Sequence, residues 1–290
     1  MSPEKAPETW MHPPATAVTE AVERALSEYL TTLGDLTAAL LPERRVTARI
    51  VARNAGRLAG SRCAGATFAL VDPGVEVRWE RSEGSVLAPG DTIALVEGAL
   101  SSVVTAERTA LNFLGHLSGV ATLTARYVEE AARSGPARIW DTRKTTPGLR
   151  ALEKAAVRAG GGRNHRGNLS DWLLIKDNHL EGMSVTEAVA RARDLWPGRT
   201  VHVECDTVEQ CGEAVDAPAD AILLDNMSEE MVRECVRIAT GRSAGRRPLL
   251  EVSGGVDLGS VGRYSACGVD QISVGAITNS APVLDVGLDI

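Results

Sequence analysis

The sequence has few aromatic residues and no excess of positive charge. Phenylalanine, tryptophan and tyrosine together make up 3% of its 290 residues, too few to provide the stacking platforms on which single-stranded nucleic acids bind. The formal net charge is -7 and the isoelectric point is about 5.4, whereas nucleic-acid-binding domains carry a basic patch. We therefore expect no nucleic-acid partner.

Long apolar runs and paired cysteines are also lacking. The N-terminal residues MSPEKAPETWMHPP contain no apolar stretch of the kind found in a signal peptide, and no later segment approaches the length of a membrane span. The five cysteines are scattered and none belongs to a CxxC pair. We expect a cytoplasmic protein with reduced, buried thiols, no membrane contact and no zinc site.

Positive charge is nevertheless concentrated in one stretch, residues 141–179. Eight cations stand there against four carboxylates, a local net charge of +4 in an acidic chain: the cations are Arg143, Lys144, Arg150, Lys154, Arg158, Arg163, Arg166 and Lys176. If these side chains converge in space, they form a receptor for a multiply charged anion.

The pattern of this stretch predicts a strand at 138–140, a helix after Pro147, a glycine loop at 160–162 and a buried strand at 172–175. Apolar residues recur at helical spacing from Leu149 to Ala159, which places Arg150, Lys154 and Arg158 on a solvated helix face. The cations expected in the receptor follow the strands or lie in the loop between them: Arg143, Lys144, His165, Arg166 and Lys176.

The rest of the chain divides into two regions. In the first, a helix at 17–29 precedes strand-like segments at 46–52, 66–71, 75–79 and 92–96, and a helical connection over 103–132 holds the domain boundary. In the second, strands at 138–140, 172–176, 200–204, 220–224, 249–252 and 271–274 alternate with helices, two of which begin with capping boxes at Ser184 and Thr207. This alternation predicts a parallel sheet closed into a barrel, with an open doubly wound sheet as the alternative.

Polar residues or glycines follow each strand of the second region. They are Arg143-Lys144, Lys176-Asp177, Glu204 with Asp206, Asp225-Asn226, Ser253-Gly254-Gly255 and Gly275. In a barrel all of them lie at the C-terminal mouth. Acidic residues there can hold sugar hydroxyls or Mg²⁺, and glycine turns can cradle phosphate. The set suits a phosphorylated sugar and a second anion, although taken singly these charges are also typical of surface ion pairs and helix caps.

Six blocks of the sequence resemble the quinolinate phosphoribosyltransferases, the decarboxylating nicotinate-nucleotide pyrophosphorylases of NAD biosynthesis: DTRKTTPGLRALEKAAVRAGGGRNHRGNLSDWLLIKDNH, ERTALNFLGHLSGVAT, VECDT, ILLDN, LEVSGG and ISVGAIT. The resemblance implies an α/β fold. An N-terminal α/β sandwich-like domain would cover 1–118, with the tail 280–290 packing back on it. An open α/β barrel of the type II phosphoribosyltransferase kind would cover 119–279. It also implies a homodimer, or a higher assembly, with shared active sites.

The resemblance further implies transfer of the phosphoribosyl group of phosphoribosyl pyrophosphate to quinolinate, with loss of CO₂, to give nicotinate mononucleotide and pyrophosphate. Quinolinate would be held by Arg108, Arg143, His165, Arg166 and Lys176, with Arg108 reaching across the dimer interface. The phosphoribosyl donor would be held by Lys144, Glu204, Asp225, Ser253, Gly254, Gly255 and Gly275, of which Lys144, Glu204 and Asp225 would be catalytic. Mg²⁺ would be bound mainly through the donor pyrophosphate, near Glu204 and Asp225.

Two other functions fit parts of the pattern. Lys144 or Lys176 could form a Schiff base in an aldolase-like barrel, since neighbouring cations activate a lysine amine. A phosphosugar-binding paralogue without catalysis would keep the glycine turns. Pyrophosphate release separates these alternatives from the transferase.

Overall fold

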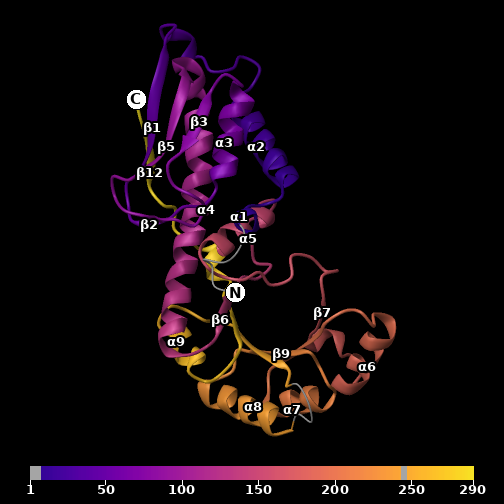
Figure 1. Ribbon diagram of the computed structural model, residues 1–290. Coiled ribbons are helices and arrows are strands. Elements are labelled where there is room, and N and C mark those ends of the chain that lie inside the picture. Colours follow the sequence, from indigo (N-terminus) through magenta and orange to yellow (C-terminus); the bar gives the residue numbers. More distant parts are fainter. Residues whose placement is uncertain (1–7, 243–246) are drawn as a thin grey trace. The chain divides into compact units, whose positions relative to one another are not determined.

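The computed structural model describes residues 8–242 and 247–290 and divides the chain into two compact units (Figure 1). The first unit contains the chain up to residue 125 together with residues 144–161 and 277–290. The second contains residues 126–143 and 162–276. Both units are mixed α/β structures, and the second is built on a parallel sheet, so the expected α/β fold class is confirmed.

The first unit is built on an antiparallel sheet with the strand order β12-β1-β5-β3. These strands are β1 (Arg45–Ala52), β3 (Glu76–Trp79), β5 (Thr92–Ala99) and β12 (Val286–Asp289). Burial alternates along the first half of β1, because successive side chains point to opposite faces of a sheet. The C-terminal strand β12 pairs with β1, from Ala52 opposite Val286 to Arg49 opposite Asp289. The tail therefore lies on the sheet of this unit.

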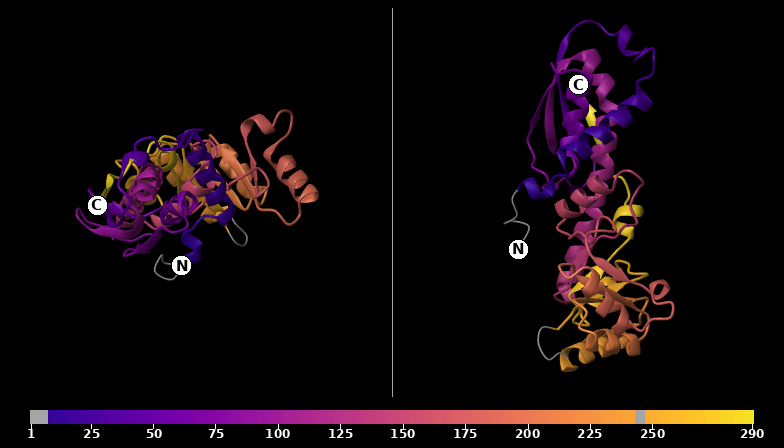
Figure 2. Two further views of the ribbon diagram at one scale, coloured as in Figure 1. Left: turned by 90° about the horizontal axis from the view of Figure 1, so that it is seen from above. Right: turned by 90° about the vertical axis from the view of Figure 1, so that its right-hand side faces the viewer.

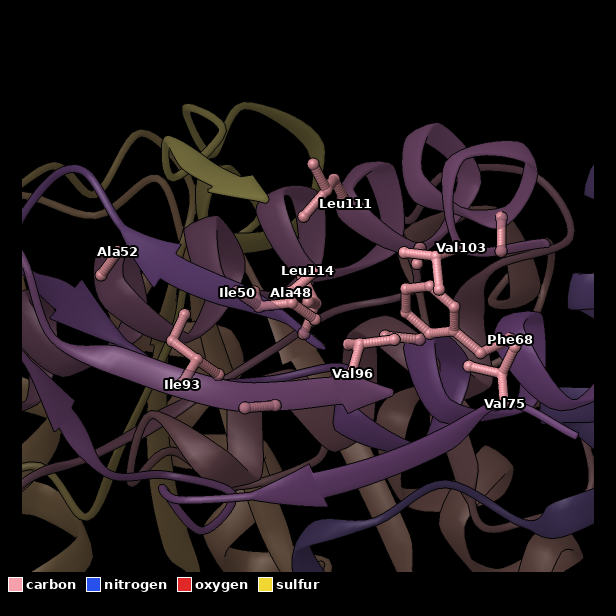
Figure 3. Packing of buried hydrophobic residues seen from close by; sticks show 14 of the residues in the cluster. Ala48, Ile50, Ala52, Phe68, Val75, Ile93, Val96, Val103, Leu111 and Leu114 are labelled. Atoms are coloured by element: carbon pink, nitrogen blue, oxygen red, sulfur yellow. The ribbon is translucent and has the colours of Figure 1, made fainter. Parts of the chain in front are cut away.

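The helices α2 (Ala15–Tyr29), α3 (Ser61–Val71) and α4 (Leu100–Ser134) complete the first unit, to which α4 contributes its first 26 residues, up to 125. Phe68 of α3, Val96 of β5 and Val103 of α4 are fully buried and meet in one apolar cluster (Figure 3). The predicted strand at 66–71 is wrong. The segment is helical because Glu83 accepts hydrogen bonds from the amides of Gly60, which precedes α3, and of Ser61, its first residue, and so stabilises the start of a helix.

Shorter elements complete this unit. They are α1 (Glu8–Met11), η2 (Ala38–Leu40), the paired strands β2 (Gly56–Arg57) and β4 (Val86–Leu87), α5 (Arg150–Ala159) and α10 (Ala276–Asn279), whose first residue is counted with the second unit. The expectation of a solvated face on α5 is confirmed at Arg150, which is exposed, and is wrong for Lys154 and Arg158. Lys154 is 7% exposed, and Arg158 donates hydrogen bonds to the carbonyls of Trp10 and His12. The N-terminal segment therefore covers the charged side of the helix at Arg158.

The second unit contains a six-stranded parallel sheet in the order β6-β11-β10-β9-β8-β7. The strands are β6 (Arg138–Trp140), β7 (Leu173–Ile175), β8 (Val201–Cys205), β9 (Ala221–Asp225), β10 (Leu249–Ser253) and β11 (Gln271–Ser273). The first strand of the unit pairs with the last, as in a barrel, and within the described residues no ladder joins β6 to β7. The barrel is therefore open at this seam.

Four helices follow strands of this sheet: α6 (Val185–Leu195), α7 (Val208–Asp216), α8 (Glu229–Arg242) and α9 (Val261–Ser265). The helices α7 and α8 lie along one side of the sheet in Figure 1 and in the right-hand view of Figure 2. Both predicted capping boxes are confirmed, because Ser184 and Thr207 accept hydrogen bonds from the amides of Glu187 and Gln210. Within the ranges 8–242 and 247–290, no helix has the length and apolar character that a membrane crossing requires.

Candidate functional site

The C-terminal edge of the parallel sheet gathers most of the predicted site residues. Asp225 ends β9 and is directly opposite Ser253, which ends β10. Glu204 is the penultimate residue of β8, and Lys176 follows β7 directly. Because the strands are parallel and in register, these side chains come from one edge of the sheet. This arrangement was predicted from the sequence alone.

Arg166 provides buried positive charge at this edge. Its side chain is almost wholly enclosed, at 6% exposure, although arginine is rarely buried without a partner. Burial lowers the pKa of the guanidinium, the charge of Arg143 lowers it further, and Glu204 and Asp171 offset part of this shift. A lowered pKa means that the folded protein disfavours the charged form. An anion bound here would relieve that penalty.

Lys176 and Glu204 form an ion pair in the same region. The Lys176 ammonium lies 2.6 Å from a carboxylate oxygen of Glu204, and both side chains are partly buried. Lys176 was predicted to hold quinolinate, and Glu204 was predicted to hold the phosphoribosyl donor. Their contact therefore joins the two proposed subsites at one point of the sheet edge.

Asp141, a fully buried residue that directly follows β6, fixes the loop that carries His165 and Arg166. One of its carboxylate oxygens accepts a hydrogen bond from the backbone amide of His165 at 2.8 Å, and the other accepts one from the side-chain amide of Asn164 at 2.6 Å. Sequence analysis did not assign a role to Asp141. The sequence nevertheless contains a signal for such a role, because Asp141 directly follows a predicted strand. The cations after strands were assigned to the site on that basis, whereas this carboxylate was not.

The turn after β10 is built for close backbone approach. Gly254 adopts φ +91°, and a Cβ atom at this position would lie 2.2 Å from the side-chain oxygen of Asn226. Asn226 is itself left-handed, with φ +52°, and its amide donates to the carbonyl of Ser253 at 2.9 Å. Gly255 also has positive φ, at +61°, and faces open space. The two turns after β9 and β10 therefore fix one another, and only glycine fits at 254.

Two predicted site residues belong to the first unit instead. Lys144 is exposed, and its carbonyl accepts a hydrogen bond from the Thr278 hydroxyl at 2.8 Å. Arg108 lies on α4 with an exposed side chain that is 3.9 Å from Glu107, a distant contact for an ion pair. It lines a cavity of about 410 Å³ within this unit, formed with residues of α2 and the segment 147–149. Gly275, which follows β11, belongs to the second unit with the sheet edge.

A cluster of buried ionisable side chains lies one layer deeper in the second unit, and sequence analysis did not identify it. Glu251 of β10, fully enclosed, has a carboxylate oxygen 3.4 Å from Nε2 of His165. The Ser273 hydroxyl donates to its other oxygen. His202 of β8 completes the group. The sequence places Glu251 and His202 inside strands rather than after them, so the strand-end criterion could not detect them.

The side-chain atoms available as metal ligands determine which metal ion the second unit could bind. Within the described residues, the one group of three potential metal ligands is His165, His202 and Glu251, whose nitrogen donors are not those that Mg²⁺ prefers. Glu204 and Asp225 offer oxygen, but Glu204 is paired with Lys176 and Asp225 accepts from the Asn226 side chain. They fit a Mg²⁺ ion that is bound mainly by substrate phosphates and contacts one or two protein carboxylates.

Comparison with known protein families assigns the chain from residue 35 onward. The profile of the family described as "Quinolinate phosphoribosyl transferase, C-terminal domain" matches residues 120–289, and that of the corresponding N-terminal domain matches residues 35–118. Together they cover the antiparallel sheet, the connecting helix and the open barrel. Five of the six sequence blocks singled out above fall within the C-terminal match, and ERTALNFLGHLSGVAT spans the junction between the two matches.

Individual relatives agree with this assignment. The chain is 40% identical over 284 residues to "Nicotinate-nucleotide pyrophosphorylase [carboxylating]" of Mycobacterium leprae, covering 94% of this chain and 97% of that protein. It is 39% identical over 261 residues to the probable enzyme of that name from Bacillus subtilis, covering 89% and 88%. The solved structure of the nicotinate-nucleotide pyrophosphorylase from Francisella tularensis superposes with a TM-score of 0.90 at 36% identity, covering 100% and 99%. The chain therefore belongs to the quinolinate phosphoribosyltransferase family.

Proposed function

We propose that the protein transfers the phosphoribosyl group of phosphoribosyl pyrophosphate to quinolinate, with loss of CO₂, and so forms nicotinate mononucleotide and pyrophosphate for NAD biosynthesis. The observation that carries this proposal is the buried cation Arg166 beside Arg143, next to the Lys176–Glu204 pair. Guanidinium and ammonium groups bind carboxylates through charge-assisted hydrogen bonds. A small acid with two carboxylates suits this group of cations.

In the acceptor subsite, Arg143, His165, Arg166 and Lys176 orient quinolinate so that its ring nitrogen faces the anomeric carbon of the donor. Positioning of the two reactants accounts for much of the rate of such a bimolecular reaction. As pyrophosphate leaves, positive charge develops at the anomeric carbon, as in glycosyl transfer. When the adjacent carboxylate then departs as CO₂, the electron pair stays on the ring carbon, where the positively charged nitrogen stabilises it, and this carbon takes up a proton from solvent to give the product. The protein needs no nucleophile for either step.

In the donor subsite, Glu204 and Asp225 bind the ribose hydroxyls, and Ser253, Gly254, Gly255 and Gly275 receive the 5′-phosphate. The positive φ angles of Gly254 and Gly255 support this role, because left-handed residues turn successive backbone amides toward an anion. Lys144 contacts the pyrophosphate. Glu204 and Asp225 are the carboxylates that would contact a Mg²⁺ ion bound with the donor, and that ion would supply charge neutralisation to the leaving pyrophosphate.

Assembly completes the proposal. We infer a homodimer, or a higher assembly, in which Arg108 of one chain completes the acceptor subsite of its partner. The guanidinium on α4 is exposed, and within the described residues its ion-pair contact is a long one, 3.9 Å to Glu107, which supports this assignment. We further propose a cytoplasmic location. The five cysteines, all buried and unpaired with one another, support a reducing compartment.

Pyrophosphate release tests the function directly. We expect Mg²⁺-dependent release with quinolinate and phosphoribosyl pyrophosphate, together with one CO₂ per turnover. Nicotinate, with one carboxylate, would leave buried cations unpaired and should be a poor substrate. Comparable kcat/KM for the two acids would contradict the proposed acceptor. Binding of the donor without any turnover would identify a phosphosugar-binding protein instead.

The Schiff-base alternative is tested by borohydride trapping. Lys176 pairs with Glu204 at 2.6 Å, which is the contact of an ammonium group, whereas Schiff-base formation requires a neutral amine. We expect no borohydride-dependent mass increase at Lys144 or Lys176 in the presence of either substrate. A covalent adduct at one of them would favour the aldolase-like reaction.

A further inference from the structure

The segment 144–149 begins with Lys144, leads into helix α5 and contains no helix or strand. Its backbone amides and carbonyls therefore need partners other than those of a helix or a sheet ladder. The Lys144 carbonyl accepts a hydrogen bond from the hydroxyl of Thr278 in α10 at 2.8 Å. Two residues later, the Thr146 amide donates to a carboxylate oxygen of Glu153 at 3.0 Å. The backbone next to Lys144 is therefore held at two points, and all four residues belong to the first unit.

The segment ends in a tight turn that runs directly into α5. The Leu149 amide donates to the carbonyl of Thr146 at 3.0 Å. Pro147 and Gly148 lie between them, and Gly148 has a φ of +78°. Proline in the second position and a left-handed glycine in the third are typical of a type II turn. From the first turn of α5, Glu153 reaches back seven residues to the amide of Thr146, the first residue of this turn.

Glu153 is fully buried, a rare position for a glutamate. A buried carboxylate is costly unless its oxygens have hydrogen-bond partners. Both oxygens of Glu153 have one. The first accepts from the Thr146 amide, and Nε2 of His116 in α4 lies 2.9 Å from the second. The side chain therefore connects the segment 144–149 to helix α4.

Helix α4 is the rigid side of this connection. A helix satisfies its backbone groups internally, and α4 also contributes Val103, Leu111 and Leu114 to the apolar core. The segment 144–149 has neither kind of support at Thr146, whose amide depends on Glu153. Loss of the Glu153 side chain should therefore release the segment and leave α4 in place.

We propose that Glu153 is a positioning residue for the donor, because it fixes the turn after Lys144 and so sets the point from which the Lys144 side chain extends. This inference rests on the proposed function, in which Lys144 contacts the pyrophosphate. Lysine has a long flexible stem, so a fixed backbone is needed to place its amino group accurately. Glu153 is enclosed, so it acts through the backbone of Thr146 and not by contact with substrate.

The alternative is a role in folding alone, and the first unit offers a control for it. Glu83 is 5% exposed and accepts hydrogen bonds from the amides of Gly60 and Ser61. It therefore resembles Glu153 in burial and in binding backbone amides near the start of a helix, but the helix is α3. Glu83→Met and Glu153→Met keep the approximate length of the side chain and remove its acceptor oxygens. Only the second variant should affect the donor.

The binding test compares two ligands by calorimetry in the presence of Mg²⁺. Phosphoribosyl pyrophosphate carries the pyrophosphate that Lys144 would contact, and ribose 5-phosphate lacks it. We expect Glu153→Met to weaken binding of the first about tenfold or more and binding of the second less than about twofold. Glu83→Met should weaken neither. The proposal is overturned if Glu153→Met weakens both ligands equally or neither, or if Glu83→Met shows the same selective loss.

Glu153→Gln tests whether the hydrogen bonds suffice. The amide oxygen can accept from the Thr146 amide, and the NH₂ group can donate to Nε2 of His116 when the ring carries its proton on Nδ1. We expect binding of phosphoribosyl pyrophosphate within about threefold of the wild-type value. A loss as large as that in Glu153→Met overturns the proposal, because the side chain would then not act by holding the segment in position.

A double-mutant cycle identifies the residue through which Glu153 acts. In the Lys144→Ala background, Glu153→Met should cause no further loss of affinity for phosphoribosyl pyrophosphate, since the two residues act as one. Additive losses would show that Glu153 acts elsewhere and would overturn the proposal.

A further measurement does not depend on a folded variant. In the wild-type protein the Thr146 amide should be protected from hydrogen exchange, although it lies outside helices and strands. Exchange at the rate of an unstructured chain overturns the proposal.

These experiments separate the inference from the proposed function. A wild-type protein that binds phosphoribosyl pyrophosphate but releases no pyrophosphate with quinolinate would refute the function, and the binding data would still decide the role of Glu153. A protein that releases pyrophosphate, with a Glu153→Met variant that binds both ligands normally, would refute the inference alone.

Discussion

The sheet of the first unit carries its charged side chains on the solvent side, and the buried charges of that unit, Glu83, Glu153 and Lys154, lie outside the sheet. The sheet of the second unit, in contrast, has a carboxylate in its interior. In β1, Arg45 and Arg49 are exposed and pair loosely with Glu97 and Asp289 at 3.7 and 3.9 Å. In the second unit, Glu251 and Asp141 are fully buried and Arg166 nearly so. Buried charge is costly to fold and is retained where it serves a purpose. The comparison therefore assigns the first unit's sheet to stability and the second unit's to chemistry.

The largest effect is expected from the apolar core of the first unit. Phe68 is fully buried among β5 and α4, so Phe68→Ala should lower the free energy of unfolding by about 3–5 kcal/mol. Arg45→Ala, on the opposite face of the same sheet, should change it by less than about 0.5 kcal/mol. Chemical denaturation of both variants measures this difference. Equal losses would contradict the division of the sheet into a structural face and a solvent face.

The pH dependence of stability tests the interior of the second unit. Because the pKa of His202 falls from 6.5 to about 4 on folding, the unfolded chain binds a proton below pH 6.5 that the folded chain does not. Stability from this group is complete above pH 6.5 and falls by about 3 kcal/mol as the pH decreases toward 4. Denaturation of wild type and His202→Gln at several pH values should show a shallower slope in the variant. Parallel curves would show that His202 is not buried as a neutral ring.

Arg166 should separate activity from stability. In Arg166→Met the charged hydrogen bonds to the acceptor are lost, so kcat/KM for quinolinate should fall by roughly 10- to 150-fold, corresponding to about 1.5–3 kcal/mol. The melting temperature should not fall, because the folded protein disfavours this charge when the site is empty. Arg242→Met is the control, since Arg242 forms an exposed pair with Asp216 in the same unit. If Arg166→Met lowers both activity and stability, its charge has a structural partner instead.

Substitution of Asp225 tests whether the donor subsite and the acceptor subsite are separate. Asp225→Ala should raise the KM for the donor by roughly tenfold and leave quinolinate binding intact, because the Asp225 carboxylate contacts the side chain of the neighbouring Asn226 and not one of the acceptor cations. Glu204→Ala should affect both substrates, since it also releases Lys176 from its ion pair. Calorimetry with each ligand distinguishes the two variants. Loss of quinolinate binding in Asp225→Ala would reverse the assignment of the subsites.

Substitution of Arg108 should have the smallest effect on folding of the single chain, but it should clearly lower the activity of the assembly. The side chain is exposed, so Arg108→Ala should fold normally while activity falls by about tenfold or more through loss of a charged hydrogen bond. Mixing Arg108→Ala chains with Lys144→Ala chains under exchange conditions should restore up to half of the wild-type activity per dimer. In the mixed dimer, one site combines Lys144 of the first chain with Arg108 of the second. Verified heterodimers as inactive as both parents would show that Arg108 acts within its own chain.

Sequence pattern predicted the strands of the second unit to within a residue or two and identified the residues after them. This succeeded because each parallel strand is a short apolar run with a polar residue or glycine immediately after it, as in Trp172 to Lys176. It failed at 66–71, where a β-branched and aromatic segment forms a helix. The reason is tertiary: Glu83, more than ten residues downstream, caps that helix.

The sequence by itself determined the alternation of strands and helices, the basic stretch at 141–179 and the glycines at 254 and 255, since each depends on local composition and backbone freedom. Only the tertiary structure decided which charges are buried and which of them meet. Lys154 on a predicted solvated face is covered, and Glu251, His202 and His165 come together from three distant segments. Burial sets the free energy of a charge, and burial depends on neighbours that the local sequence does not contain.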